Sequence, residues 1–471
     1  MRGGGHIAAI ALGLVFAALC VWHYAPMLPG AELWQFDEWY TAERTESILF
    51  RGEWLTLFSN GEPVFKKPPL QYWAGATLLL AGVPDWLALR LPSVFSAFGV
   101  AGMAFAMAAR LAGTAWAGLA ALALLTGSTV FWVSATSAML DMPAALFLLG
   151  SVMATMAAWR RPALWWVVAV LVGLGALQKA PVSVAAVAVT ALVMARGGRP
   201  KGGRHLWGAL VLGVLLVAVW PLVQWLHSGD AALRVAFVQE QSQRFLPGWG
   251  GWARQFRWAT WAWADGAWLW GAMLAAALAL PFVARRQTAW VVTMLVALFL
   301  IALTAARGEV FDRYLMQVLP FAAVAGGVVA VRLFRPALAL AVVALVSLSA
   351  GGQFKTAAAV GLAGPGMAPF RPLLTDFRAA IRPDESLIVC GWGKSDLILF
   401  PGALWLMGSA EKPFRRIWRA EELPEAIAID NIRPPLRGLC LEAEFAEVQK
   451  AQPGVEEVAR DQGFVHWVYR P

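Results

Sequence analysis

The stretch IAAIALGLVFAALCVWHYAP (residues 7–26) decides the fold class, and LWQFDEWYTAERTES (33–47) follows it closely. The first stretch is an apolar run long enough to cross a bilayer. It begins near Arg2 as a signal peptide would, but it lacks a clear small-x-small cleavage site and further apolar runs follow. We therefore expect a retained first transmembrane helix. The second stretch gathers four acids in a chain of which only 14% is charged.

The composition extends this interpretation to most of the chain. Of 471 residues 59% are hydrophobic and the mean hydropathy is +0.62, values typical of a polytopic α-helical membrane protein. About eleven transmembrane helices are predicted, over 7–24, 91–109, 115–134, 142–158, 164–179, 181–195, 207–226, 267–284, 289–305, 314–331 and 336–350. The shorter stretch 68–82 contains proline and is expected to form an interfacial or re-entrant helix.

The short connections between alternate spans are basic and contain no acid. They hold Arg110, then Arg160 and Arg161, then Arg196, Arg199, Lys201 and Arg204, then Arg285 and Arg286, then Arg332 and Arg335. The positive-inside rule places these loops and the N-terminus in the cytoplasm, and eleven spans place the C-terminus outside. This topology accounts for the net charge of +9, so no nucleic-acid partner is expected.

The chain is predicted to divide into a membrane domain over 1–350 and a small extracytoplasmic α/β domain over 351–471. Outer-face loops are expected at 25–90, with a turn at SNGEP, and at 227–266. In the tail, SLIVCGW, LRGLCLE and GFVHWVYR have the pattern of strands, and AEELPEAIAID and EAEFAEVQKAQ that of helices. Cys390 and Cys440 end two of these strands, so they are either a disulfide in an oxidising compartment or two buried thiols.

Ionisable groups gather at the outer ends of the predicted spans, where a charge is costly and therefore suggests function. They are Asp37, Glu38, Lys66, Lys67, Asp141, Lys179, Glu240, Arg244, Arg307, Asp312 and Arg313, with Tyr314 beside them. A carboxylate can act as a general base, and lysine or arginine can hold a phosphate. Such a set on one membrane face favours a phospholipid-linked substrate whose phosphate departs.

Simpler interpretations stand beside this one. Glu43 and Glu46 are spaced to form the solvent face of a short helix, and Lys66 and Lys67 could anchor lipid headgroups. Arg307 and Asp312 could form an ordinary loop ion pair. A carrier or flippase for lipid-linked sugars would place charges in mid-span, which this chain does not, and an envelope scaffold would leave Asp37 unexplained.

The first outer loop resembles that of the C-type glycosyltransferases (GT-C). FDEWYTAERTESILFRGEWLTLFSNGEPVFKKPPLQYW, followed by ALRLPSVFSAFGV, is similar to the lipid A aminoarabinose transferases and to the protein O-mannosyltransferase-like family. MLDMP, LQKAP, QEQSQRF and RYLMQVLP match later landmarks of the family in order and spacing. The resemblance covers about residues 1–350 and leaves the tail out.

This resemblance implies an inverting transferase of the bacterial inner membrane. It would move a sugar from a polyprenyl-phosphate carrier to a hydroxyl of a lipid, glycan or protein on the periplasmic face. By position Asp37 matches the catalytic carboxylate, with Glu38 in support, and Asp141 matches a second acid. Lys67 and Arg244 match residues that hold the carrier phosphate, and Lys66, Lys179, Arg313 and Tyr314 are further candidates for that role.

Three positions depart from the family pattern. Lys66 and Gln241 stand where the aminoarabinose transferases have a Glu and a His associated with a bound metal, and neither replaces a zinc ligand. We therefore expect no metal or other cofactor. Tyr40 replaces an Arg that would contact the phosphate, so a sugar other than aminoarabinose, or a different acceptor, is expected.

Overall fold

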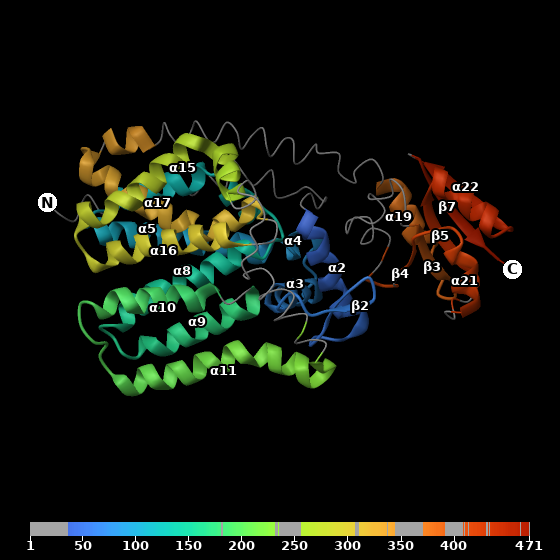
Figure 1. The fold of residues 1–471 in the computed structure, drawn as a ribbon, viewed down its shortest axis with the longest axis horizontal. Coiled ribbons are helices and arrows are strands. Elements are labelled where there is room, and N and C mark those ends of the chain that lie inside the picture. Colours follow the sequence, from blue (N-terminus) through green and yellow to red (C-terminus); the bar gives the residue numbers. More distant parts are fainter. Residues whose placement is uncertain are drawn as a thin grey trace. The chain divides into compact units, whose positions relative to one another are not determined.

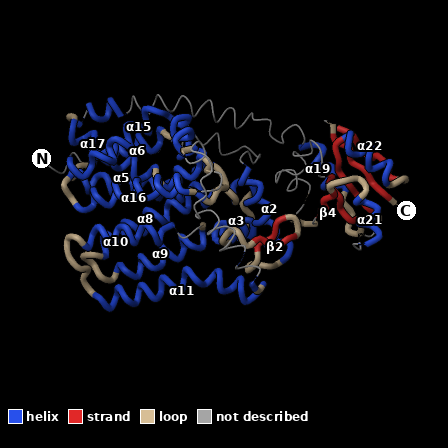
Figure 2. Tube along the Cα trace, viewed as in Figure 1, coloured by secondary structure: helices blue, strands red, loops and turns tan. Residues whose placement is uncertain are grey.

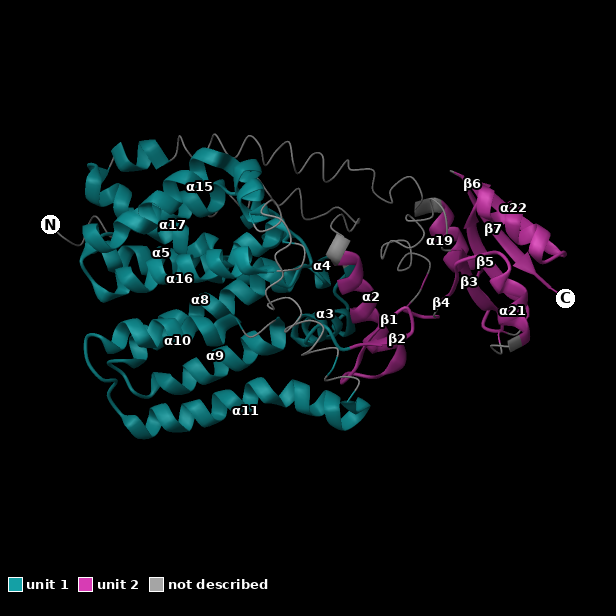
Figure 3. Ribbon diagram, viewed as in Figure 1, with its two compact units in different colours: residues 1–30, 65–360 teal, residues 31–64, 361–471 magenta. Residues whose placement is uncertain are grey.

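A computed structural model of the chain describes residues 36–179, 182–230, 234, 256–306, 310–336, 338–343 and 371–390 and, with gaps of one or two residues, 408–470. The chain forms two compact units (Figure 3). Residues 1–30 and 65–360 make the first, and residues 31–64 and 361–471 make the second. The second unit therefore joins the first predicted outer loop to the tail.

The first unit is an assembly of apolar helices (Figure 1). Its elements are α3 (Leu70–Leu80), α4 (Asp85–Ala88), α5 (Leu91–Ala112), α6 (Ala115–Gly127), α7 (Thr129–Thr136), α8 (Asp141–Ala158), α9 (Leu164–Gln178), α10 (Val182–Ala195), α11 (Gly203–Ser228), α15 (Arg257–Ala284), α16 (Gln287–Ala305), the 3₁₀ helix η3 (Asp312–Gln317) and α17 (Leu319–Leu333).

Five of the described helices are long and apolar enough to cross a membrane: α5, α8, α11, α15 and α16. The helices α9, α10 and α17 are apolar but shorter. The predicted span over 115–134 is two helices, α6 and α7, which meet at a bend of 76°. The predicted span 7–24 lies outside the described residues, as does most of 336–350. The multi-pass helical fold is confirmed, whereas the count of eleven stays a prediction.

Small residues set the closest packing in this unit. A Cβ at Gly327 in α17 would come within 2.5 Å of the Ala117 carbonyl oxygen and 2.6 Å of the Ala121 nitrogen in α6. The two helix backbones therefore touch, as small residues allow where apolar helices pack in lipid. Around this contact lies a continuous apolar core contributed by α5, α6, α8, α15, α16 and α17.

A buried carboxylate caps the bend between α6 and α7. Asp265 of α15 is 5% exposed. It accepts hydrogen bonds from Ser128 Oγ at 2.6 Å, from the backbone nitrogens of Thr129 at 2.6 Å and Val130 at 3.3 Å, and from Trp270 Nε1 at 2.7 Å. These nitrogens open α7 and have no partner within the helix, so Asp265 supplies the acceptor that they need.

The second unit begins with helix α2 (Phe36–Arg51) and a hairpin of β1 (Leu57–Ser59) and β2 (Glu62–Val64). Asn60 and Gly61 form the predicted turn with positive φ of 47° and 81°, the conformation that asparagine and glycine adopt most readily. Glu43 is fully buried and accepts hydrogen bonds from Ser59 Oγ and the Asn60 nitrogen, both at 2.6 Å. The prediction that Glu43 faces solvent was wrong, because its carboxylate satisfies the polar groups of this turn.

The tail of the second unit is a five-stranded sheet in the order β4-β3-β5-β7-β6, with its strands red in Figure 2. Its elements are α19 (Arg371–Ala380), β3 (Ser386–Cys390), β4 (Phe414–Ile417), α21 (Glu422–Ile429), β5 (Leu436–Leu441), α22 (Glu442–Ala451), β6 (Val455–Asp461) and β7 (Phe464–Tyr469). The three predicted strands and two predicted helices are present. Strands β4 and β6 and helix α19 were not foreseen.

The centre of this sheet holds a disulfide and a buried polar cluster. Cys390 of β3 is joined to Cys440 of the neighbouring parallel strand β5, which selects the disulfide over two buried thiols. Arg437 donates hydrogen bonds to Glu385 at 2.6 and 3.0 Å, and its Nη1 lies 2.6 Å from His466 Nε2. Burial and the charge of Arg437 together lower the pKa of His466 to about 4.

The hairpin and the tail are joined within the second unit. Asn60 Nδ2 donates to the Phe414 carbonyl at 3.2 Å, and the Phe414 nitrogen donates to Asn60 Oδ1 at 2.9 Å. Arg378 of α19 lies 3.9 Å from a carboxylate oxygen of Glu46 in α2, so Glu46 is paired rather than simply solvated. These contacts between distant parts of the sequence explain why 31–64 belongs to this unit.

Candidate functional site

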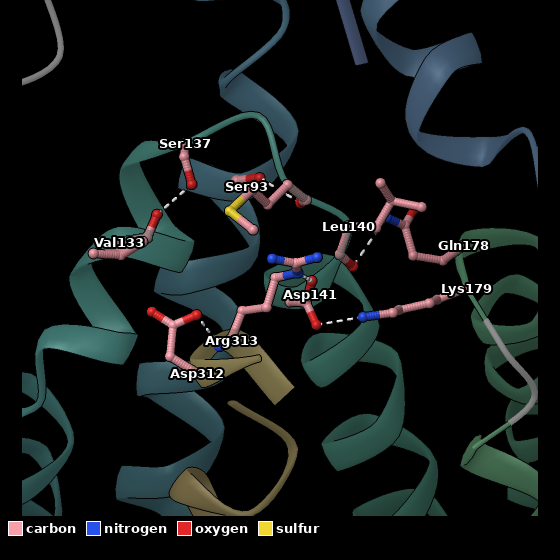
Figure 4. Close-up of polar contacts among 10 residues, drawn as sticks. Ser93, Val133, Ser137, Leu140, Asp141, Gln178, Lys179, Asp312 and Arg313 are labelled. Carbon is pink, nitrogen blue, oxygen red and sulfur yellow. Dashed lines mark hydrogen bonds and ion pairs between the residues drawn. The ribbon is translucent and has the colours of Figure 1, made fainter. Parts of the chain in front are cut away.

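Four of the predicted site residues meet at one end of the helical unit. We call Asp141, Lys179, Arg313 and Tyr314 the Asp141 cluster; Figure 4 shows the first three. Lys179 Nζ donates to Asp141 Oδ1 in a short hydrogen bond, and Arg313 Nε lies 3.9 Å from Asp141 Oδ2. The Asp141 side chain is 3% exposed, and those of Lys179 and Arg313 are each 16% exposed. One carboxylate thus faces two cations.

The segment that delivers Asp141 is held by hydrogen bonds to its backbone carbonyls. Ser93 Oγ of α5 donates to the Met139 carbonyl at 3.1 Å, and Gln178 Nε2 of α9 donates to the Leu140 carbonyl at 3.3 Å. Asp141 then begins α8, where a negative charge interacts favourably with the helix dipole. The hydrogen bonds to this segment and the start of the helix therefore set the position of the carboxylate.

The 3₁₀ helix η3 presents Arg313 and Tyr314 to this carboxylate. Lys179 Nζ lies 4.8 Å from the centre of the Tyr314 ring and the Arg313 guanidinium 5.5 Å from it. The guanidinium also lies 4.2 Å from the ring of Phe311. Cations over aromatic faces are stabilised by the ring quadrupole, more strongly where water is scarce. The aromatic pair therefore helps to hold both cations near Asp141.

Asp312 adds a second acid beside Arg313, in the connection between α16 and α17. Burial raises the pKa of its carboxyl, although the hydrogen bond from the Arg313 nitrogen at 2.7 Å and the Arg313 charge lower it in part. The alternative pairing of Asp312 with Arg307 cannot be followed, because residue 307 lies outside the described residues.

The basic-proline segment FKKPP (65–69) directly precedes helix α3, which contacts the Asp141 end of the helical unit. Gln178 Nε2 donates to Gln71 Oε1 of α3 at 3.0 Å, which joins the residue before Lys179 to the helix that follows FKKPP. Lys66 is exposed and Lys67 half-buried in the turn between β2 and α3. The cluster and the segment that carries the two lysines are thereby tied together through one pair of glutamines.

The remaining predicted residues cannot be placed in this cluster. Asp37 lies in the first turn of α2, in the second unit, but its side chain is outside the described residues. Glu38, beside it, is fully buried. Glu240, Gln241 and Arg244 also fall outside the described residues. In the part of the chain that the structure describes, His, Cys, Asp and Glu side chains form no group of three suited to a metal ion.

Two structural supports of the site were missed from the sequence. Asp265 was taken as part of an outer loop, and Gln178 was read only as the residue before Lys179. A sequence signal existed for Asp265, since a lone acid among the tryptophans of WAWADGAWLW is costly to bury without partners. Its partners at 128–130 lie far away in sequence, so their identity had no such signal.

What this arrangement can do chemically follows from its charge. Lysine binds an anion as a point charge, and arginine binds a phosphate or carboxylate through parallel hydrogen bonds. Here both cations are gathered beside an aromatic ring, with Asp141 facing both and Asp312 next to Arg313. The Asp141 cluster therefore offers the kinds of side chain that bind a phosphate.

Comparison with known proteins places these observations in a family context. Residues 66–225 match the model of the dolichyl-phosphate-mannose-protein mannosyltransferase family. The undecaprenyl phosphate-alpha-4-amino-4-deoxy-L-arabinose arabinosyl transferase 2 of Sodalis glossinidius is 29% identical over 153 residues, 32% of this chain and 28% of the relative. The corresponding Edwardsiella ictaluri transferase is 34% identical over 104 residues, 18% of this chain and 19% of its own. The chain thus spans only about a quarter or less of these relatives.

Solved structures extend the likeness over the whole chain. ArnT from Cupriavidus metallidurans bound to undecaprenyl phosphate matches with a TM-score of 0.73 at 17% identity, over 99% of this chain and 98% of that one. The same protein in the apo state gives 0.75 at 17% identity, over 98% of each chain. The GT-C membrane fold expected from the sequence is confirmed, and the chain is similar to the aminoarabinose transferases.

Proposed function

We propose that this chain is an integral-membrane glycosyltransferase that moves a sugar from a polyprenyl-phosphate carrier to a hydroxyl group of an acceptor in the cell envelope. The observation that carries the proposal is the Asp141 cluster, in which two cations and one carboxylate meet at the end of a GT-C helical unit. Its lysine and arginine are the side-chain types that hold a departing lipid phosphate. The relatives named above act, by their names, on an undecaprenyl-phosphate sugar.

In the proposed reaction the acceptor oxygen attacks the anomeric carbon as the bond from that carbon to the carrier phosphate oxygen breaks. The proton of the acceptor hydroxyl passes to the Asp37 carboxylate, and the bonding pair leaves with the polyprenyl phosphate. Attack from the side opposite the leaving group inverts the anomeric centre. Lys67 and Arg244, together with Lys179 and Arg313, stabilise the charge that develops on the phosphate, and such stabilisation is often the largest catalytic contribution.

The role proposed for Asp141 differs from that of Asp37. Its carboxylate already accepts from Lys179 and faces Arg313, so it is suited to orient cations rather than to take up a proton. We therefore propose Asp37 as the general base and Asp141 as a positioning residue. Tyr314 completes the phosphate side of the site through its contacts with both cations.

We also propose that the reaction takes place on the outer face of a bacterial inner membrane, with the N-terminus cytoplasmic and the second unit periplasmic. The basic, acid-free connections at 110, 160–161, 196–204 and 285–286 support this orientation through the positive-inside rule. Lys66 and Gln241 support a reaction without a bound metal, and Tyr40 supports a donor or acceptor different from that of the aminoarabinose transferases.

The test is sugar transfer by the full-length protein in vesicles supplied with a labelled pool of polyprenyl-phosphate sugars. We expect a labelled acceptor with the wild type and none with Asp37→Asn. Glu62→Gln is the matched control, because Glu62 is an exposed acid on β2 of the same unit, and it should transfer at the wild-type rate. Near wild-type transfer by Asp37→Asn would exclude Asp37 as the base.

The second candidate is a carrier that moves the lipid-linked sugar across the membrane without bond chemistry. The described helices argue against it, because Asp265, a buried acid of α15, is committed to capping α7 rather than to a transport path. Movement of labelled donor across the vesicle membrane without any labelled acceptor would favour the carrier.

A further inference from the structure

An apolar groove of about 800 Å³ lies on the helical unit away from the Asp141 cluster. Helix α9 forms its floor, and α10 and α11 form its walls; Figure 1 shows α9 between them. Every side chain that lines the groove is apolar, the central ones being Val168, Val172, Val187, Ala191, Gly213 and Val217. The groove therefore suits a hydrocarbon chain.

The groove exists because the two helices that form its walls, α10 and α11, pack against different helices. Helix α11 lies against α9, where a Cβ at Gly173 would come within 2.5 Å of Leu216 Cβ and one at Gly208 within 2.5 Å of Trp166. Helix α10 instead packs mainly on α8 and α16. The walls diverge, and much of the apolar surface of α11 is exposed, as at Leu210, Val214 and Leu222.

One end of the groove is surrounded by unpaired positive charge. Trp159, Pro200 and Leu206 line this end, and Arg160, Arg199 and Lys201 lie next to them and are exposed. Residues 159–205 contain no Asp or Glu, and none of these three cations has a carboxylate partner among the residues that the structure describes. Trp159 Nε1 donates to the Gly198 carbonyl at 3.0 Å, which fixes the basic loop against the groove.

In the described part of the chain, no comparable group of basic side chains lies at the opposite end. Val184, Leu222 and Trp225 line it, and the cation that follows α9 there, Lys179, is already bound to Asp141. The residues of α9 that line the groove, Trp165 to Val172, belong to the half of that helix nearer the basic loop. An anionic amphiphile in the groove would therefore find its cationic partners at the basic end.

We propose that this groove binds an anionic phospholipid, with an acyl chain along α9 and the headgroup phosphate beside Arg160, Arg199 and Lys201. Hydrocarbon burial supplies affinity, and clustered Lys and Arg supply preference for a negative headgroup. Trp159 lies at the level where tryptophan favours the membrane interface. The site is separate from the proposed transfer site and takes a structural lipid rather than the sugar donor.

The test measures binding of dioleoyl phosphatidylglycerol and of dioleoyl phosphatidylcholine to the purified full-length protein in detergent, by native mass spectrometry at low and at 0.15 M salt. Four proteins are compared: the wild type, the headgroup variant Arg199→Gln/Lys201→Gln, the groove variant Ala191→Phe, and the control Arg285→Gln/Arg335→Gln. The control removes the same charge from other basic connections that do not line the groove.

We expect the wild type to prefer phosphatidylglycerol at least tenfold over phosphatidylcholine. The headgroup variant should lose that preference, the groove variant should bind both lipids at least tenfold more weakly, and the control should stay within twofold of the wild type. Circular dichroism and size-exclusion profiles show whether each variant is folded; if Ala191→Phe is not, Val217→Trp replaces it.

Three results would overturn the proposal. An equal loss of preference in the control would show diffuse attraction to the positive face. Wild-type binding by the groove variants would show that the acyl chain lies elsewhere. Loss of polyprenyl-phosphate binding in the groove variants, with phosphatidylglycerol unaffected, would identify the groove as the place of the donor's own tail.

Discussion

Asp141 holds two cations that would otherwise repel each other in a poorly hydrated place. Lys179 and Arg313 approach its two oxygens from different elements. Removal of the carboxylate alone takes from Lys179 and Arg313 the acid that they share, and breaking a buried pair in this way costs about 3–5 kcal/mol. The residue is thus important for stability and for the geometry of the proposed phosphate site.

For this residue we expect Asp141→Asn to lower both the midpoint temperature of thermal unfolding and the transfer rate, the latter by about tenfold to a hundredfold. The double variant Asp141→Asn/Lys179→Met removes one of the stranded cations. It should recover much of the lost stability but not the transfer activity. Thermal unfolding and labelled-sugar transfer measure the two effects. If the double variant recovered both its stability and its transfer activity, Asp141 would act through stability alone.

Lys66 and Gln241 lead to a prediction about metals. Because neither side chain is a zinc ligand, EDTA should leave the transfer rate of the purified protein within twofold of the untreated sample. The change Lys66→Glu/Gln241→His should raise the zinc retained on purification, as elemental analysis would measure. Inactivation by EDTA, reversed by added zinc, would show that this chain uses a metal held by other residues.

The elements show how far the sequence could predict this fold. Long apolar runs gave the helices α5, α8, α11, α15 and α16, because hydrophobicity over a bilayer's width is a local property. The bend between α6 and α7 was not predicted, because its cause is the distant carboxylate of Asp265. Glu43 was misread for the same reason, since its partners lie on the hairpin that follows the helix.

In the candidate site, too, the residue types could be predicted from the sequence, whereas the contacts with distant partners could not. The residue types and their positions at the ends of spans predicted that Asp141, Lys179, Arg313 and Tyr314 would lie together, and they do. The sequence could not show that Asp141 itself accepts from Lys179, since pairing depends on side-chain direction. The supporting residues Ser93 and Gln178 act through backbone carbonyls, which no residue pattern reveals.

At the level of elements, Asp265→Asn should destabilise the helical unit by about 2–4 kcal/mol. The amide keeps one acceptor but brings its NH₂ group against donors that already point at the carboxylate. Ser128→Ala, which removes one of the four hydrogen bonds, should cost only about 1 kcal/mol. Denaturation in detergent would compare the two, and equal losses would contradict a capping role for Asp265.

A second prediction at this level concerns the hairpin turn. Asn60→Gly keeps the left-handed conformation but loses both hydrogen bonds to Phe414, whereas Asn60→Ala loses the bonds and also strains the backbone. We expect both variants to be cleaved faster than the wild type between the hairpin and the tail. Asn60→Ala should be cleaved faster than Asn60→Gly, because its strained backbone destabilises the unit by about 1 kcal/mol more. Equal resistance in the wild type and both variants would show that this contact does not hold the parts together.

Over the whole molecule, the second unit should be the part that responds to acid. His466 has a folded pKa of about 4 against an ordinary 6.5, so its contribution to stability is complete above pH 6.5 and is lost as the pH falls toward 4. Although burial raises the pKa of Glu385, its hydrogen bonds with Arg437 and Arg382 outweigh this and lower it. Its contribution is therefore lost below about pH 4.5.

The measurement is the unfolding of the full-length protein at pH 7.5, 5.5 and 4.5. Between pH 6.5 and 4 the free energy of unfolding of the second unit should fall by at most about 1.4 kcal/mol per pH unit, the limit for one proton. His466→Gln retains an acceptor for Arg437 and does not titrate, so its stability should be nearly constant above pH 5. A wild-type slope in that variant would assign the effect to another group.

The contacts of Asn60 with Phe414 and of Glu46 with Arg378 also order events during biosynthesis. Residues 31–64 leave the ribosome well before their partners at 361–471, which are made only after all the helices between them. The second unit can close only when those partners have been made and the intervening helices have been inserted. Folding of the first segment therefore waits for the tail, and a chain that stops short of its tail carries α2 and its hairpin without the surface on which they fold.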